Sequence, residues 1–91
     1  MQPQEQLREL LELARQAGIE VRLGPARAEG EMPGGGLVSL RGREVLFLNS
    51  QAAVADRVAA VAAALKGRRQ IEESFILPEL RALIDAQEHQ T

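Results

Sequence analysis

Few residues of this 91-residue chain carry the side chains that catalysis or metal binding requires. The chain has no cysteine, which excludes a thiolate nucleophile, a disulfide and any site in which cysteine binds zinc or an iron–sulfur cluster. Its single histidine, His89, lies near the C-terminus, where chains are often frayed. A histidine-rich metal centre and a Ser-His-Asp triad on a rigid element are therefore excluded. We expect no catalytic residue, no metal and no cofactor.

Two pairs of neighbouring glutamates are the remaining candidates for acid–base chemistry: Glu29 with Glu31, and Glu72 with Glu73. Hydrolysis by paired carboxylates needs two groups that face each other across a cleft, one of them desolvated. Glutamates that neighbour each other on a polar stretch are usually solvated and rarely have the tuned pKa values of a catalytic pair. An enzyme is consequently the least favoured of three functional hypotheses. Its site would form between subunits from Arg81 and a loop carboxylate such as Glu31.

Four arginines could form an anion- or RNA-binding patch: Arg41, Arg43, Arg68 and Arg69. Arginine suits this role because its guanidinium binds phosphate through two parallel hydrogen bonds. Glutamates lie beside these arginines, however, and the net charge of −2 opposes binding to the phosphates of a nucleic acid. The chain also has only 2 aromatic residues on which bases could stack. RNA or anion binding is therefore the alternative function, and nucleic acid is not the partner that we expect.

A run of glycines, Gly34–Gly36, precedes the most regular apolar segment of the chain. A P-loop would need Lys-Ser/Thr after its glycines, and a dinucleotide-binding fold would need glycines that open a helix. Here the glycines open a strand, so we interpret residues 34–49 as a β-hairpin. Its predicted turn is Gly42-Arg43, with glycine supplying the positive φ of a type II′ turn. A turn at Arg41-Gly42 is disfavoured because it would need a positive φ at an arginine.

Both faces of the predicted hairpin carry large apolar side chains, so both need cover. One face has Val38, Leu40, Val45 and Phe47, and the other has Leu37, Ser39, Leu46 and Leu48. A small antiparallel sheet usually leaves one face polar. The N-terminal helix or a second copy of the chain must therefore cover Leu37, Leu46 and Leu48. Because two-fold pairing is the commonest form of oligomer, we expect a homodimer with these three leucines at its interface.

Apolar periodicity predicts the other elements of a single α+β domain over residues 1–91. Residues 3–17 are predicted to form a helix that ends at Gly18. Residues 19–23 are predicted to form a strand whose side chains Ile19, Val21 and Leu23 face inward. A second helix is predicted to run from a cap at Asn49 or Ser50 to Gly67. Residues 71–77 are either a connector that packs Phe75 into the core or a short edge strand, and a third helix begins at Pro78. Residues 26–33 are expected to be a mobile loop. The predicted order is α-β-β-β-α-α, with the strands in a three-stranded antiparallel meander.

The composition is that of an ordinary globular domain, with 45% hydrophobic and 26% charged residues. No stretch approaches the ~20 apolar residues of a membrane span, and the polar N-terminus does not resemble a signal peptide. We therefore expect a cytoplasmic protein with no membrane partner. The preference for arginine over lysine and the many alanines indicate a high-GC genome and are compatible with a thermophilic source.

The segment from Gly35 to Leu48, the helix that follows it, and Leu77-Pro78-Glu79-Leu80-Arg81 resemble a family of short bacterial proteins of unknown function. These proteins share a helix, a Gly-Gly-apolar-x-apolar-x-Gly hairpin and a Pro-x-x-Arg-apolar C-terminal helix. The resemblance covers about residues 7–86, and Arg41, Gly42 and Arg81 match its pattern. It implies an α+β domain in a bacterial cytosol and supplies no activity. From the sequence we expect a non-catalytic protein–protein interaction module that acts as a homodimer, with a further protein partner of unknown identity.

Overall fold

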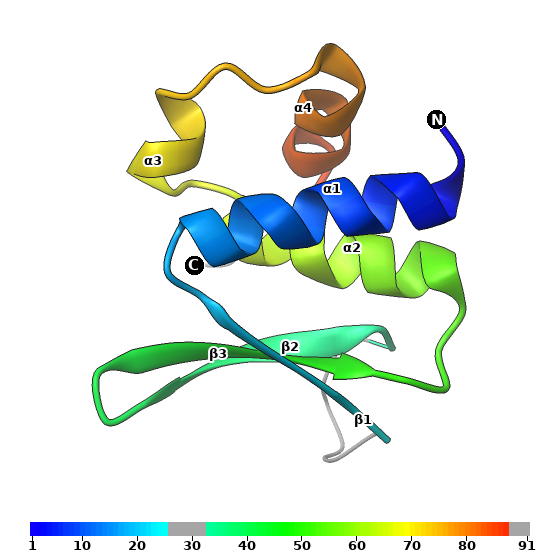
Figure 1. Cartoon of the computed structure of the whole chain (residues 1–91), viewed down its shortest axis with the longest axis vertical. Coiled ribbons are helices and arrows are strands. Elements are labelled where there is room, and N and C mark those ends of the chain that lie inside the picture. Colours follow the sequence, from blue (N-terminus) through cyan, green and yellow to red (C-terminus); the bar gives the residue numbers. More distant parts are fainter. Residues whose placement is uncertain (26–32, 88–91) are drawn as a thin grey trace.

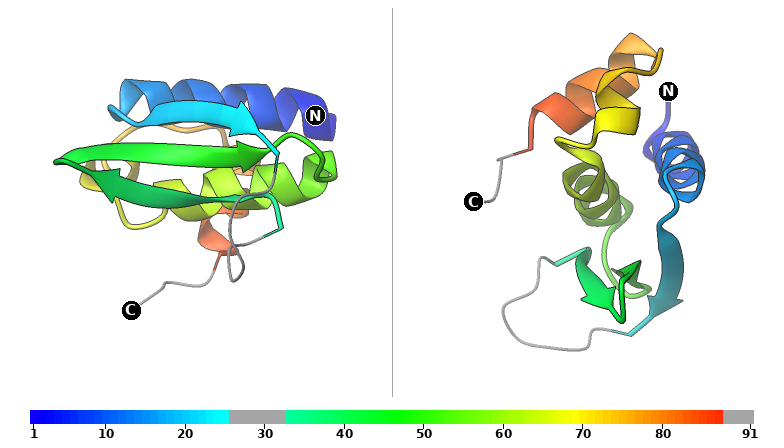
Figure 2. Two further views of the ribbon diagram at one scale, coloured as in Figure 1. Left: turned by 90° about the horizontal axis from the view of Figure 1, so that it is seen from below. Right: turned by 90° about the vertical axis from the view of Figure 1, so that its left-hand side faces the viewer.

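Three layers make up the protein in the computed structural model, which describes residues 1–25 and 33–87 (Figure 1). The elements are, in chain order, α1 (Pro3–Gln16), β1 (Glu20–Gly24), β2 (Gly35–Leu40), β3 (Arg43–Asn49), α2 (Val54–Leu65), α3 (Arg69–Glu72) and α4 (Pro78–Asp85). The strands form one layer, α1 and α2 lie side by side on one face of the sheet, and α3 and α4 lie on the far side of these two helices (Figure 2). The predicted α+β class is confirmed, with the short helix α3 added to the predicted elements.

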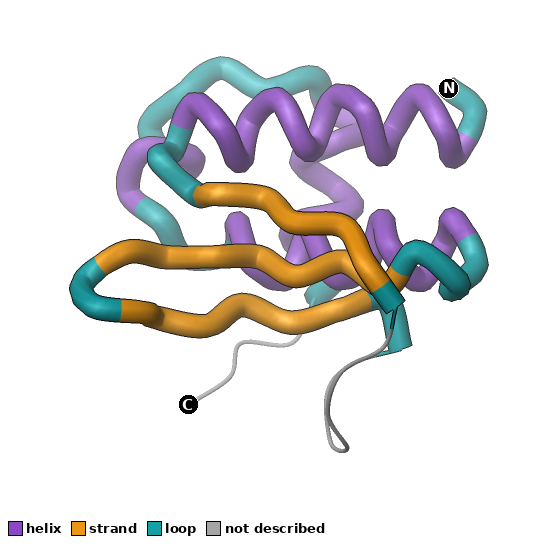
Figure 3. The backbone as a smooth tube through the Cα atoms, turned by 60° about the horizontal axis from the view of Figure 1, so that its bottom comes forward, coloured by secondary structure: helices purple, strands orange, loops and turns teal. Residues whose placement is uncertain are grey.

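The sheet differs from the predicted antiparallel meander. Its strand order is β1-β3-β2, so that β3 lies in the middle (Figure 3). β2 and β3 form the expected antiparallel hairpin, whereas β1 runs parallel to β3, with Glu20 opposite Val45. A meander would need β1 and β2 to be neighbours, but the connection from Gly24 to Gly35 is much longer than the roughly 2–5 residues of a hairpin loop. That length allows β2 to lie one strand away from β1, and β3 fills the space between them.

The hairpin turn lies one residue earlier than the sequence predicted. Arg41 and Gly42 form the turn, with φ angles of 51° and 79°, and Leu40 is paired with Arg43. Positive φ at both central residues is the type I′ geometry, which matches the right-handed twist of the two strands. The prediction of a type II′ turn at Gly42-Arg43 is therefore wrong, because strand twist outweighs the cost of a positive φ at arginine. Each cross-strand partner moves by two positions, so every side chain keeps its predicted face.

Helix α2 occupies the centre of the core, between the sheet and α4. The main buried residues around it come from every layer: Leu10, Ala14, Ile19, Leu46, Leu48, Val58, Val61, Leu65, Ile71, Ile76, Leu80 and Ile84. The alanines Ala60, Ala62 and Ala64 on α2 are also buried. Because alanine side chains are short, α2 can lie close to both of its neighbouring layers. Helices α1 and α2 therefore share one face of the sheet, and α4 packs on these helices and not on the strands.

The residues from 71 to 77 adopt neither of the two predicted arrangements. The chain forms α3, and the side chain of Phe75 is 88% exposed, while Ile71 and Ile76 on either side of it are buried. Arg81 fixes this course, because its Nη2 donates to the carbonyl oxygens of Ile71 and Ser74 at 3.0 and 2.9 Å. Packing Phe75 into the core is therefore wrong, since Ile76 takes the inward position that the prediction gave to the phenylalanine.

Helix α2 begins later than its predicted caps, whereas α4 begins at Pro78 as predicted. Asn49 ends β3, and its side chain accepts a hydrogen bond from the Gln51 amide at 3.0 Å and donates to the Pro33 carbonyl at 3.1 Å. The N-cap of α2 is Ala53, which has no side-chain cap. Asn49 therefore stabilises the turn between β3 and α2 and does not cap the helix.

The glycine run serves close packing. A Cβ atom on Gly34 would lie 1.9 Å from the backbone oxygen of Asp56, in the first turn of α2. A Cβ atom on Gly35 would lie 1.9 Å from the backbone oxygen of Phe47, on the neighbouring strand. The start of β2 can therefore contact both α2 and β3 only because these two positions have no side chain.

Candidate interaction surfaces

The three leucines expected at a dimer interface do not share one environment. Leu46 and Leu48 are 0% and 4% exposed, and they pack in the core beneath α1 and α2. Leu37 lies opposite Leu46 on the edge strand β2 and is 38% exposed. The chain's own helices supply the cover that a second copy was expected to provide for Leu46 and Leu48. Only Leu37 is available to a partner.

The other face of the sheet carries no helix in the described part of the chain (Figures 1 and 2). Val45 is nevertheless only 2% exposed, flanked in register by Glu20 and Val38. The carboxylate of Glu20 binds two guanidinium groups, that of Arg22 and that of Arg43, whose Nη2 lies 2.6 Å from Oε1. These polar side chains lie over the outer face, because long arginine side chains can cover apolar surface with their stems.

Electrostatics on this face follow from the same contacts. The hydrogen bond from Arg22 holds the pKa of Glu20 below its ordinary value, although partial desolvation acts in the opposite direction. The guanidinium carbon of Arg22 also lies 5.8 Å from the ring centroid of Phe47, within the range of a cation–π contact. The hairpin face that carries Val38, Leu40, Val45 and Phe47 is therefore partly covered by charged side chains of its own sheet.

The two edges of the sheet differ in their protection. The backbone N–H of Asn49 donates to the carbonyl of Gly34 at 2.9 Å. This bond determines which residues of β2 are hydrogen-bonded to β3, because hydrogen-bonded and non-hydrogen-bonded pairs alternate along an antiparallel ladder. By that alternation, the amide and carbonyl groups of Gly35, Leu37 and Ser39 point away from β3, towards an edge that no described strand occupies. β2 contains no charged residue and no proline. Natural edge strands usually carry such residues to prevent pairing with another chain, so β2 is an unprotected edge.

The opposite edge, β1, carries charged residues. Glu20 and Arg22 alternate with apolar residues along this strand. Leu23, which the alternation predicted to face inward, is 63% exposed at this edge, whereas Ile19 is buried. β1 therefore resembles an ordinary solvated edge, and β2 is the better candidate for strand pairing.

The four arginines proposed for anion binding do not form a cluster of unpaired guanidinium groups. Arg68 binds both carboxylate oxygens of Glu44, and Arg43 binds Glu20. Arg41 is exposed in the hairpin turn, and Arg69 is exposed at the start of α3. Two of the four charges are therefore already neutralised by carboxylates of this chain.

Arg81, one of the two arginines that match the resemblance, is bound by other residues of its own chain. Besides its bonds to two backbone carbonyls, its Nη1 lies 3.6 Å from the carboxylate of Glu72. Glu72 therefore faces an arginine, and Glu73 is exposed beside it. Glu29, Glu31, His89 and the loop predicted at residues 26–33 fall outside the described residues, except for Pro33.

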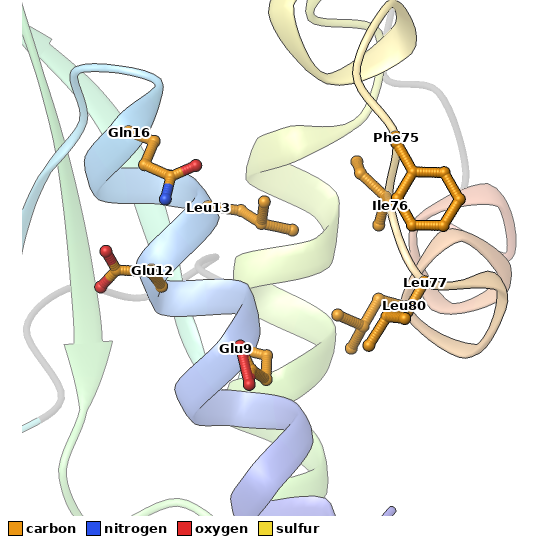
Figure 4. A pocket seen from close by; sticks show the side chains of 8 residues that line it. All are labelled: Glu9, Glu12, Leu13, Gln16, Phe75, Ile76, Leu77 and Leu80. Carbon is orange, nitrogen blue, oxygen red and sulfur yellow. The ribbon is translucent and has the colours of Figure 1, made fainter.

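A groove between helices is the surface that the sequence did not predict. One wall is α1, and the other is the segment that joins α3 to α4 together with the start of α4 (Figure 4). We call it the helical groove; its lining residues are Glu9, Glu12, Leu13, Gln16, Phe75, Ile76, Leu77 and Leu80. The only sequence signal for it is the apolar run at 75–77, which follows the polar residues 72–74.

Within residues 1–25 and 33–87, no group of three or more histidine, cysteine, aspartate or glutamate side chains could hold a metal ion. No helix in this part of the chain is long and apolar enough to cross a membrane. Comparisons of the chain with protein-family models, with curated proteins and with solved structures find no match. What the protein does must therefore be inferred from its own surfaces, of which the β2 edge and the helical groove are the most distinctive.

Proposed function

We propose that the protein is a non-catalytic protein–protein interaction module that acts as a homodimer, with the β2 strands of two copies paired. The observation that supports this proposal is the unprotected β2 edge. Gly35, Leu37 and Ser39 direct backbone donors and acceptors outward along a strand without charge. Leu37 and Leu40 add exposed apolar side chains, at 38% and 46%. An edge of this kind favours strand pairing with a second chain.

Antiparallel pairing about a two-fold axis at Leu37 satisfies this edge completely. The outward groups of Gly35 in one copy would bond those of Ser39 in the second copy, and the two Leu37 residues would meet at the axis. The result is a continuous six-stranded sheet with all helices on one face. The two Arg41 turns lie at opposite ends of such an interface, so that like charges do not face each other.

The RNA- or anion-binding alternative has less support, because Arg43 and Arg68 already bind carboxylates. It would need Arg41 and Arg69, which are exposed, to act without their two neighbours. RNA binding that weakens with salt and disappears in the double variant Arg41→Glu with Arg69→Glu would favour this alternative.

Sedimentation equilibrium at tens of micromolar protein tests the homodimer. We expect the dimer mass for the wild type, and the monomer mass for Leu37→Lys and for Ser39→Pro. Proline at 39 removes only an amide that points away from β3, so the ladder within the chain is kept. Leu23→Lys is the matched control, because Leu23 is on the same face at the other edge and is more exposed. A monomeric wild type, or a Leu37→Lys variant that remains dimeric, would contradict the proposal.

A further inference from the structure

We infer that the helical groove is a second binding site, which takes an apolar segment of a partner protein flanked by basic residues. This inference goes beyond the homodimer, because no residue of the sheet lines the groove. Three observations support it: an exposed aromatic residue that follows a hydrogen-bonded segment, two adjoining hollows of suitable size, and a charge of one sign along the lining.

Phe75 is the aromatic residue, and its exposure is imposed by the surrounding fold. Its side chain is 88% exposed, while the next residue, Ile76, is 7% exposed in the core. The hydrogen bonds from Arg81 to the carbonyls of Ile71 and Ser74 hold the chain just before Phe75. Leu77, on the other side of Ile76, is 46% exposed. The fold therefore presents two large apolar side chains at the edge of a groove, as binding surfaces often do.

The size of the groove fits two apolar side chains. The helical groove is open to solvent and has a volume of about 170 Å³, and an adjoining hollow of about 370 Å³ shares Leu13, Gln16 and Phe75 with it. The adjoining hollow continues towards α3 through Gln70 and Ile71. A cavity of roughly 150 Å³ with apolar walls is large enough for a benzene ring. A helical segment with two apolar anchors about one turn apart would place one anchor on each side of Phe75.

The charge of the lining selects the flanks of that segment. Among residues 1–25 and 33–87, Glu9 and Glu12 are the only ionisable residues that line either hollow. Arg15 lies 3.9 Å from Glu12, but both side chains are more than half exposed, so this ion pair is weak and leaves the groove acidic. Lysine or arginine beside the anchors would complement the two glutamates, whereas an anionic membrane surface or a nucleic acid would be repelled.

Two helical peptides with the same apolar face test the inference. Each carries one tryptophan and one leucine a turn apart, and one peptide has lysine flanks while the other has glutamate flanks. The protein contains no tryptophan and no tyrosine, so tryptophan emission reports on the peptide alone. We expect the emission of the lysine peptide to shift to shorter wavelength as the protein is added, with a lower Kd than for the glutamate peptide and with weaker binding at high salt.

Variants of the groove make the test specific. Phe75→Ser should raise the Kd of the lysine peptide about tenfold or more, as loss of an aromatic anchor does. Leu23→Ser is the matched control, because it removes another exposed apolar side chain far from the groove lining and should leave the Kd unchanged. Glu9→Lys combined with Glu12→Lys should reverse the preference between the peptides. Glu5→Lys, an exposed position on α1 outside the lining, should not.

The outcomes separate this site from the dimer. Leu37→Lys should bind the lysine peptide as the wild type does, whether or not the wild type is dimeric. Equal affinity of the wild type and Phe75→Ser, or an unchanged preference in the double variant, would overturn the inference. Loss of self-association in Phe75→Ser without any effect on the peptide would also overturn it, because the groove would then belong to a second copy of the chain.

Discussion

Arg68 holds Glu44 through two nitrogens, each bound to a different carboxylate oxygen, with Nη1 2.7 Å from Oε1. Arg68 lies between α2 and α3, and Glu44 lies on the helix-facing side of β3. The Nε atom of Arg68 also donates to the carbonyl of Ala64, near the end of α2, at 2.8 Å. One guanidinium therefore ties the end of α2 to the central strand. Paired hydrogen bonds of this kind fix geometry as well as charge.

This pair should make stability depend on pH. The hydrogen bond from Arg68 holds the pKa of Glu44 below its ordinary value. At a pH between the folded and the unfolded pKa of Glu44, the folded protein therefore binds fewer protons than the unfolded chain. The stabilisation is complete above the unfolded pKa of roughly 4.3 and is lost as the pH falls through the folded pKa. Because 41% of the Glu44 side chain is exposed, the effect should be at most about 1 kcal/mol.

Urea denaturation at neutral pH, and again at a pH well below the ordinary glutamate pKa, measures this pH-dependent stabilisation. Glu44→Gln should lose less free energy of unfolding on acidification than the wild type. Glu73→Gln, an exposed carboxylate with no ion pair among the described residues, should behave as the wild type does. An equal loss in the wild type and in Glu44→Gln would contradict the prediction.

Gly34→Ala should destabilise the protein by about 1–3 kcal/mol, the range found for overpacking. The added methyl group would overlap the backbone of Asp56, which cannot move without disturbing the first turn of α2. Gly24→Ala is the matched control, because a Cβ atom there has no neighbour within 4 Å. Its free energy of unfolding should stay equal or rise slightly, since alanine restricts the unfolded chain. Thermal unfolding followed by circular dichroism compares the two variants.

Arg41→Asn should stabilise the hairpin by ~0.5–1 kcal/mol, because asparagine tolerates the left-handed region better than arginine and Asn-Gly favours a type I′ turn. Gly42→Ala should have the opposite effect, of ~1 kcal/mol or more, because φ at this position is 79°. Chemical denaturation of both variants gives the comparison. A type II′ turn at residues 42 and 43 would leave Arg41 outside the turn, and Arg41→Asn would then bring no gain.

Ile76→Ala should cost about 2–5 kcal/mol, whereas Phe75→Ser should leave the free energy of unfolding nearly unchanged. The reason is burial, since Ile76 is 7% exposed and Phe75 is 88% exposed. Phenylalanine is the larger side chain, so a position in the core would reverse this order. Guanidinium denaturation of the two variants and the wild type decides between the arrangements.

Features set by local pattern could be predicted from the sequence. The α1 stripe places Leu10 and Ala14 in the core, and α4 begins at Pro78, as expected from spacing and from the position of proline. The faces of the hairpin were also predictable, because an error of two positions in pairing leaves every side chain on its side of the sheet.

Features that depend on neighbours distant in sequence could not be predicted. The apolar residues on both faces of β3 indicate a central strand, but nothing local shows that β1 is its second neighbour. The direction of Phe75 depends on Arg81, which holds the preceding carbonyls from the next helix. For the same reason the helical groove was not predictable, since its two walls come from opposite ends of the chain.

The central place of β3 has a consequence for synthesis on the ribosome. Both edge strands emerge before the strand to which each of them pairs, and β1 has to wait for the whole of β2 and the turn. A nascent chain that ends before Arg43 therefore contains the residues of β1 and β2 but not the strand with which either of them pairs. Because parallel pairing across such a separation forms slowly, β1 should remain open to other chains for longer than β2 during translation.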